Sequence, residues 1–282
     1  MTKKPIIILF AMFSLLISGC SSKFAYNNID WMLYWYVDDY IELDKAQKSL
    51  LDVKIESWHT WHRERELQAY RQHLVDMRQD VESGQLSAER WGFHLQQGTS
   101  HWERFRDHIS PELTSLAVNL TDQQIESFFE ILEEDNLENI EERQDSTVEE
   151  RVKENRKRTQ KQVKKWIGRL STGQKRLVDE HVNEFESTFD EWIKYRRNIQ
   201  EASKTLLLSR NDNPNFAQQL TTLMANPDQF RSETYLKANQ HNRDVFATLL
   251  TKLNSTLTEK QRRRAINEID DLIDDIDDLM ND

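Results

Sequence analysis

The segment from Phe24 to Gln47 constrains the fold most, because it is apolar nearly all the way round a helix. Its hydrophobic residues are Ile29, Trp31, Met32, Leu33, Tyr34, Trp35, Tyr36, Val37, Tyr40 and Ile41. A helix without a polar face is buried either in a protein core or in lipid. This one is too short to cross a bilayer. We therefore expect a core helix, and the alternative is an aromatic segment that lies in a membrane interface.

The composition predicts long helices with few turns. The 282 residues include only 6 glycines and 4 prolines, and 31% of them are charged. Glycine and proline disfavour helices most, so their scarcity indicates an all-α protein. The other predicted helices have one apolar face each, and each of them needs a partner. We expect an elongated bundle of long antiparallel helices around a central aromatic helix, as a single domain over residues 27–282.

The first residues have the layout of a secretory signal. Two lysines are followed by an apolar run over residues 6–17 and then by Ser18, Gly19 and the sole cysteine, Cys20. A basic start, a short apolar run and small residues before a cleavage point predict a signal peptide over residues 1–19. The alternative is an uncleaved N-terminal anchor.

The sequence Ile-Ser-Gly-Cys that ends at Cys20 resembles the bacterial lipobox. The resemblance implies that Cys20 becomes the first mature residue and carries the lipid, with residues 20–26 as a lipidated tether. Lipoproteins of Gram-negative bacteria that stay in the inner membrane usually have an aspartate after the cysteine, and here the residue is Ser21. The resemblance therefore implies a lipid anchor in the outer membrane, with the body of the protein in the periplasm.

The charge of the chain narrows the choice of partners. The formal net charge is −11, and removal of the two lysines of the signal makes it −13 (−11 − 2). So acidic a body is unsuited to nucleic acid or to anionic lipid surfaces. We expect two partners, the outer membrane through the lipid and a protein in the envelope.

The middle of the chain predicts a helical hairpin. One helix is expected to start at residues 120–124 and to extend to Arg169, residues 170–174 are expected to make a turn, and a second helix is expected to run on to about Leu208. In an antiparallel pair, Arg151 would face Asp190, and opposite charges would meet along much of the hairpin. The pattern favours this pairing, although each exposed ion pair contributes only a few tenths of a kcal/mol.

An apolar stripe in the second arm is the candidate binding surface. It consists of Val178, Val182, Phe185, Phe189 and Trp192, at alternating spacings of four and three. The facing part of the first arm, residues 141–162, offers only two valines as cover. Either another helix covers the stripe, or Val182, Phe185, Phe189 and Trp192 form an exposed groove for a partner.

Helix starts of one kind recur along the chain. Residues 120–124 read LTDQQ and residues 257–261 read LTEKQ. Threonine at the N-cap and glutamine three residues later form a capping box, which is useful in any long helix. These leaders also resemble the LTxxQ motif of the Spy/CpxP family of periplasmic chaperones and stress regulators. That resemblance implies binding of unfolded clients, although this chain is longer and strongly acidic.

A second resemblance involves the whole chain. Tyr26, Asn27, Asn28, Asp30 and Trp31 follow the lipobox-like cysteine and precede the long helices. The arrangement resembles an uncharacterised family of Gram-negative lipoproteins, known only as a domain of unknown function. The resemblance implies location and fold, and it carries no catalytic residue.

Motifs for chemistry are sparse. Glu56, His59 and His62 share one helical face, but the chain has no second Glu-x-x-His and no H-E-x-x-H. It also has no glycine-rich phosphate loop and no Gly-x-Ser-x-Gly elbow. A basic run over residues 151–165 suits either the hairpin or an anionic partner. We expect no cofactor, no metal and no enzymatic activity.

Together these patterns predict an outer-membrane lipoprotein, anchored by Cys20, whose periplasmic helices form a protein-interaction or scaffold module. The alternative is a Spy/CpxP-like chaperone or envelope-stress protein that binds unfolded clients along the apolar stripe.

Overall fold

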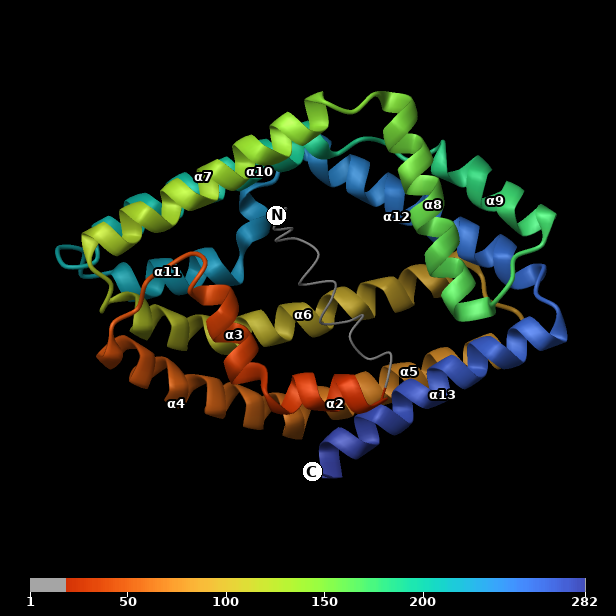
Figure 1. Ribbon diagram of the computed structural model, residues 1–282, viewed down its shortest axis with the longest axis horizontal. Helices are drawn as coiled ribbons and strands as arrows, with labels where there is room; N and C mark the ends of the chain where they lie inside the picture. The colour runs from red at the N-terminus through yellow and green to blue at the C-terminus, as the bar shows by residue number, and fades with distance from the viewer. Residues whose placement is uncertain (1–18, 282) are drawn as a thin grey trace. The chain divides into compact units, whose positions relative to one another are not determined.

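The computed structural model describes residues 19–281, and all of its regular secondary structure over that range is helical (Figure 1). The predicted all-α fold class is therefore confirmed. Residues 1–18 of the predicted signal peptide lie outside the described residues. The side chains of residues 19–22 also lie outside them, so the predicted modification of Cys20 is not addressed by the structure.

The chain divides into two compact units. One contains residues up to Gln79 together with Ile266 onward, and the other contains Asp80 to Ala265. Helices α5 (Leu67–Ser83) and α13 (Glu259–Asn281) each continue from one unit into the other. The single domain predicted for residues 27–282 therefore stays a prediction, and the two units are described separately.

The first unit is built from the N-terminal helices and the C-terminal one. Its elements are α2 (Gly19–Asn27), α3 (Ile29–Val37), α4 (Lys45–Trp61), a π-helical turn (His62–Glu66), the start of α5 (Leu67–Ser83) and most of α13 (Glu259–Asn281). The segment predicted as a lipidated tether is thus helical. Asp44 caps α4 through the backbone amide of Gln47, at 2.9 Å, and the Gln47 side chain accepts a hydrogen bond from the Asp44 amide.

The core of this unit comes from one-sided helices, as their spacing predicted. The residues Leu51, Ile55, Trp58, Leu67, Leu74, Ile269, Ile273, Ile276 and Leu279 are all buried. Helix α13 runs beside α5 (Figure 1), and ion pairs join Arg71 to Asp277 at 2.6 Å and Arg78 to Asp270 at 2.5 Å. The acidic face of α13 thus supplies partners for arginines of α5, while Ile269, Ile273 and Ile276 are buried.

The predicted central aromatic helix is wrong. Helix α3 ends at Val37 and has no buried residue, and Trp31 and Trp35 are 66% and 64% exposed. The physical reason is that α4, α5 and α13 bury their apolar faces without it. Helix α3 packs against α4. Because its apolar residues lie on all sides of the helix, the sequence did not indicate which side would be exposed to solvent.

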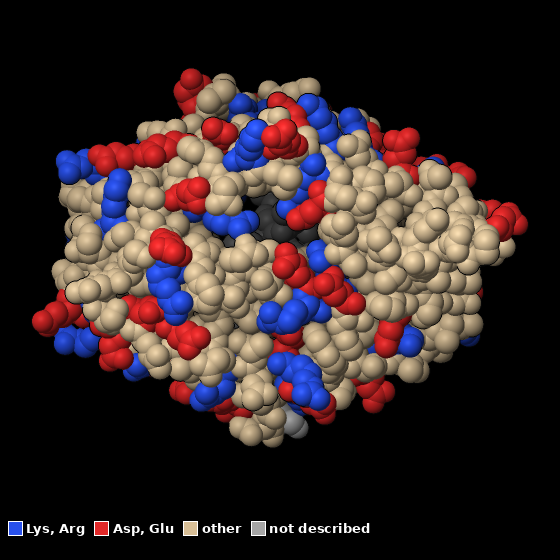
Figure 2. Space-filling model, turned by 180° about the vertical axis from the view of Figure 1, so that it is seen from behind, with Lys and Arg blue, Asp and Glu red and all other residues tan. Residues whose placement is uncertain are grey.

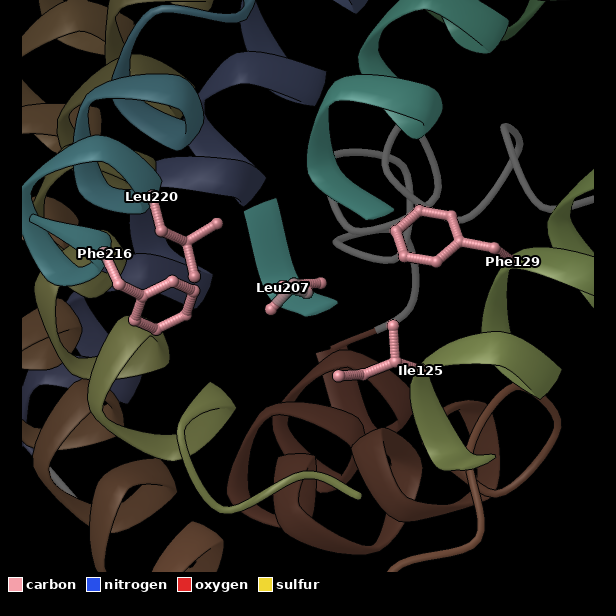
Figure 3. Close-up of a cluster of buried hydrophobic side chains, with 5 residues drawn as sticks. All are labelled: Ile125, Phe129, Leu207, Phe216 and Leu220. Atoms are coloured by element: carbon pink, nitrogen blue, oxygen red, sulfur yellow. The ribbon is translucent and has the colours of Figure 1, made fainter. Parts of the chain in front are cut away.

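The second unit contains the remaining helices. They are α6 (Ala88–Ala117), α7 (Asp122–Gln144), α8 (Val148–Ile167), α9 (Thr172–Val182), α10 (Phe189–Leu208), α11 (Phe216–Ala225), a 3-10 turn (Pro227–Phe230) and α12 (Glu233–Ser255). Helix α6 packs against α11 and α12, and α12 also packs against α9. A cluster of buried side chains joins three of these helices (Figure 3): Ile125 and Phe129 from α7, Leu207 from α10, and Phe216 and Leu220 from α11.

The predicted hairpin is correct in direction and wrong in its continuous arms. Helix α7 packs against α10 and α8 against α9, but the first arm breaks at residues 145–147 and the second at residues 183–188. The first break follows from a capping box, in which Thr147 accepts from the Glu150 amide at 3.2 Å and Glu150 accepts from the Thr147 amide at 2.9 Å. Arg151 lies on α8, which packs against α9, whereas Asp190 lies on α10, which packs against α7. The predicted facing of Arg151 and Asp190 therefore does not occur as an ion pair.

Charges of both signs are interspersed on the face of the molecule that Figure 2 shows. In Figure 2 the lysine and arginine side chains lie beside aspartate and glutamate side chains rather than in one large area. Within the basic run, Arg156 reaches Asp179 at 3.2 Å, and Lys157 reaches Glu154 at 2.6 Å. These contacts favour the structural interpretation of the basic run over an anionic partner.

Candidate interaction surfaces

The apolar stripe of the second arm is covered at its start. Val178 is fully buried and Val182 is 3% exposed, because α9 packs against α12. The part of the prediction that made Val182 an accessible binding residue is therefore wrong. The alternative, in which another helix covers the stripe, holds at these two positions.

The rest of the stripe is half-buried, and arginines lie over the rings of Phe189 and Trp192. Phe185 lies in the turn between α9 and α10, and Phe189 and Trp192 lie on α10 with ring centroids 5.8 Å apart. The guanidinium of Arg143 lies 5.0 Å from the centre of the Phe189 ring, and that of Arg196 lies 5.0 Å from the centre of the Trp192 ring. Such cation–π contacts occupy the ring faces. The client-binding hypothesis stays a prediction, without the continuous exposed groove on which it depended.

An open groove lies elsewhere on the same arm. It encloses about 680 Å³ between α10, α11 and the 3-10 turn. Its lining residues are Asn198, Glu201, Ala202, Thr205, Leu206, Ser209, Asn213, Gln219, Gln229 and Phe230. Their side chains are mostly uncharged and able to form hydrogen bonds, around apolar contributions from Ala202, Leu206 and Phe230.

Local capping and turn chemistry shape this groove. Asn213 donates to Gln219 at 2.8 Å and its Oδ1 accepts from the backbone amide of Asn215 at 3.0 Å, which fixes the loop before α11. Two Asn-Pro pairs, at residues 213–214 and 226–227, bound α11. The sequence did not predict the groove. A cluster of turn residues near one helix end was the available signal, since binding residues gather on loops held by a rigid scaffold.

The motif residues that follow Cys20 form a second site, on the first unit. The Tyr26 hydroxyl lies 3.0 Å from Nδ1 of His62, and Nε2 of His62 lies 3.4 Å from the Tyr70 hydroxyl. The Tyr26 ring also packs against the His59 ring, with centroids 4.6 Å apart. Asn27 accepts a hydrogen bond from Arg63 at 2.7 Å. Tyr26 and Asn27 therefore fasten α2 to α4 and to the π-helical turn.

Burial changes the titration of this site. Loss of solvent raises the pKa of Tyr26 to about 12, although Arg63 opposes the shift. Burial, together with the charge of Arg63, lowers the pKa of His59 below its usual 6.5. The buried Nε2 atom of His59 has no hydrogen-bond partner, so a proton there would lack solvation. At neutral pH the site therefore contains a phenol and a neutral His59 ring.

The histidines that sequence placed on one face of a helix thus serve as packing and hydrogen-bonding partners for Tyr26. Over the described part of the chain, no group of three or more His, Cys, Asp or Glu side chains is positioned to hold a metal ion. Within the same range, no helix combines the length and hydrophobicity required to cross a membrane.

The fold and these sites define an all-helical protein with an open groove and a tightly docked N-terminal helix. The chain belongs to a family of unknown function, DUF6279, whose profile matches residues 39–236. The match covers α4 to the start of α12 and includes the groove, whereas Tyr26 and the other motif residues lie before it. No curated protein and no solved structure matches the chain.

Proposed function

We propose that this protein is an outer-membrane lipoprotein whose periplasmic helical body binds a segment of another envelope protein in the α10–α11 groove. The groove is the observation that carries the proposal. Small-molecule sites are usually enclosed, whereas this groove is open, and its lining combines amide and hydroxyl groups with apolar surface from Ala202, Leu206 and Phe230. That combination is typical of protein interfaces, with an apolar core and a polar rim.

The charge of the groove indicates the chemistry of the partner. Glu201 is the only charged side chain among the residues that line it, and Glu201 is exposed. A segment with one lysine or arginine and several hydrogen-bonding groups would complement it. The proposed attachment, by lipid on Cys20, rests on the sequence that precedes the cysteine.

The attachment and the binding need separate tests. Mass spectrometry of the N-terminal peptide from purified membranes should find acyl chains on Cys20, and the protein should fractionate with the outer membrane. An unmodified Cys20 in a protein released by washing would contradict the lipoprotein assignment.

Site-specific photo-crosslinking tests the groove. A photoreactive residue at Gln219 should give one discrete adduct in intact envelopes, whereas the same residue at Lys237, an exposed position of α12, should give none. Ala202→Arg should block the groove and abolish the adduct at Gln219. Ala217→Arg, on an exposed position of α11 that does not line the groove, is the matched control. Adducts of equal yield at Gln219 and Lys237, or no effect of Ala202→Arg, would contradict the proposal.

A further inference from the structure

Three large aromatic side chains near the N-terminus are exposed. Phe24 in α2 is 65% exposed, and Trp31 and Trp35 in α3 are 66% and 64% exposed. Trp31 and Trp35 are four residues apart, so they lie on one side of α3. We call Phe24, Trp31 and Trp35 the aromatic face. Three large apolar side chains that remain in water within twelve residues are unfavourable, and such exposure marks a surface that contacts something else.

Helix α3 is docked on α4 through Tyr34, so the exposure of its tryptophans is not a consequence of a loose helix. The Tyr34 hydroxyl lies 2.9 Å from the carbonyl oxygen of Lys48 and 2.7 Å from Oδ1 of Asp52. Lys48 also forms an ion pair with Asp38 at 3.1 Å, and its ammonium group lies 5.7 Å from the centre of the Tyr34 ring. These contacts hold α3 on α4 through Tyr34.

The position of Cys20 indicates what covers the aromatic face. Cys20 lies one helical turn before Phe24 in the same helix. Backbone hydrogen bonds from Asn28 to Phe24 (3.1 Å) and from Met32 to Asn28 (3.3 Å) continue across the junction of α2 and α3. No flexible linker therefore separates Cys20 from Trp31, and eleven residues at the helical rise span at most about 17 Å. A lipid on Cys20 would bring the aromatic face to the membrane surface.

We infer that Phe24, Trp31 and Trp35 insert into the interface of the bilayer that holds the lipid of Cys20, and this inference rests on the proposed lipid anchor. Tryptophan favours the interface because its ring is apolar and its N–H can hydrogen-bond to headgroups. Asp30, Asp38 and Asp39 flank the tryptophans, and Lys23 is the only basic residue between Cys20 and Asp39. The surface is therefore one of uncharged phospholipid, since anionic lipid would repel these carboxylates.

The inference makes α2 and α3 a second contact with the membrane beside the lipid. Two contacts about one helix apart would also orient the first unit on the membrane, which a lipid alone would not do.

Fluorescence quenching tests the insertion in the full lipidated protein. The protein is reconstituted into phosphatidylcholine vesicles with plain or brominated acyl chains, and tryptophan emission is compared. We expect quenching by the brominated lipid in the wild type and loss of that quenching in the Trp31→Phe, Trp35→Phe double variant. This variant keeps both aromatic rings and removes both indoles, so its fold is preserved. Trp102→Phe, at a 39% exposed position of α6, is the control and should leave the quenching unchanged.

Other outcomes would contradict either the insertion of the aromatic face or the lipid anchor. Acylated protein that sediments with vesicles but shows no quenching would overturn the insertion and leave the lipid anchor standing. Equal quenching in the double variant would also overturn it. A blue shift of the emission that depends on protein density and not on bromine would assign the aromatic face to a second copy of the chain. An N-terminal peptide without lipid would overturn the anchor and this inference together.

Discussion

The hydroxyl of Tyr26 and the Nδ1 atom of His62 lie 3.0 Å apart and join α2 to the π-helical turn that follows α4. Single π-helical turns inside α-helices are rare, and they often mark functional positions. Here the turn lies between α4 and α5, and its first residue, His62, contacts both Tyr26 and Tyr70. The docking of α2 therefore depends on a short network of hydrogen bonds through His62.

Tyr26→Phe should weaken this docking. The change keeps the ring packing on His59 but removes the hydroxyl that His62 contacts, at a cost of about 1 kcal/mol, or roughly fivefold in the local opening equilibrium. Hydrogen exchange of the backbone amides of residues 23–37 measures this opening. Tyr36→Phe is the control, because the Tyr36 ring packs on Tyr40 without a hydroxyl contact to α4 among the described hydrogen bonds. Equal exchange in both variants would show that the hydroxyl does not hold α2.

Acid should loosen the same segment. The pKa of His59 is lower in the docked state than its usual 6.5, so undocking takes up a proton at pH values between the two. Protection of residues 23–37 is therefore full above about pH 6.5 and falls as the pH drops below that value. Hydrogen exchange at pH 7.5 and 5.5, corrected for intrinsic rates, checks this while most carboxylates stay ionised.

His59→Gln separates this effect from other titrations, since glutamine cannot take up the proton. The variant should show the same protection of residues 23–37 at both pH values. If it keeps the full pH dependence of the wild type, another group is responsible.

The sequence predicted the helices well where the apolar residues were one-sided, and poorly where they were not. Ile269, Ile273 and Ile276 recur at helical spacing, and all three are buried. In α3 the apolar residues surround the axis, so periodicity could not distinguish the docked Tyr34 from the exposed Trp31. A helix that is apolar all round can be buried or can contact a membrane, and the choice depends on its neighbours in space.

Replacement of the exposed tryptophans should therefore leave the free energy of unfolding nearly unchanged. Trp31→Ala and Trp35→Ala should each change the free energy of unfolding by no more than about 0.5 kcal/mol, as is usual for exposed sites. Leu249→Ala, at a fully buried position of α12, should cost about 2–5 kcal/mol by leaving a cavity. Urea unfolding followed by circular dichroism compares them. A loss above 1 kcal/mol for either tryptophan would mean that its ring belongs to a core.

The sequence patterns did not predict the groove or the breaks in the two arms of the hairpin. The Thr147 capping box is visible as Thr-x-x-Glu, so the break before α8 was available from local chemistry. The break between α9 and α10 has no such signal, because Thr188 caps α10 without a side-chain hydrogen bond. The groove needs α10 and α11 to be placed side by side, which a period of 3.6 residues does not specify.

One buried polar residue contributes hydrogen bonds to the contact between α7 and α10. Asn136 is fully buried, and it occupies the apolar spacing of α7 that Ile125 and Phe129 begin. Its Nδ2 donates to Gln200 at 2.7 Å and to Glu133 at 2.9 Å, and its Oδ1 accepts from Arg196 Nε at 2.7 Å. Arg197 in turn pairs with Glu133, and this pairing holds the pKa of Glu133 below its usual range. Both the nitrogen and the oxygen of the Asn136 amide therefore form hydrogen bonds, which explains why this amide is tolerated among apolar neighbours.

Asn136→Ala should accordingly destabilise the second unit by about 2 kcal/mol, because it removes the acceptor of Arg196 Nε and the donor to Gln200. Asn139→Ala is the matched control, since Asn139 lies one turn further on α7 and donates only to the carbonyl of Asp135 in its own helix. That control should be nearly neutral, because alanine favours the helix. Urea unfolding gives both values, and hydrogen exchange should place the loss in α7 and α10. Equal effects of the two substitutions would mean that the cross-helix network contributes nothing to the pairing of α7 with α10.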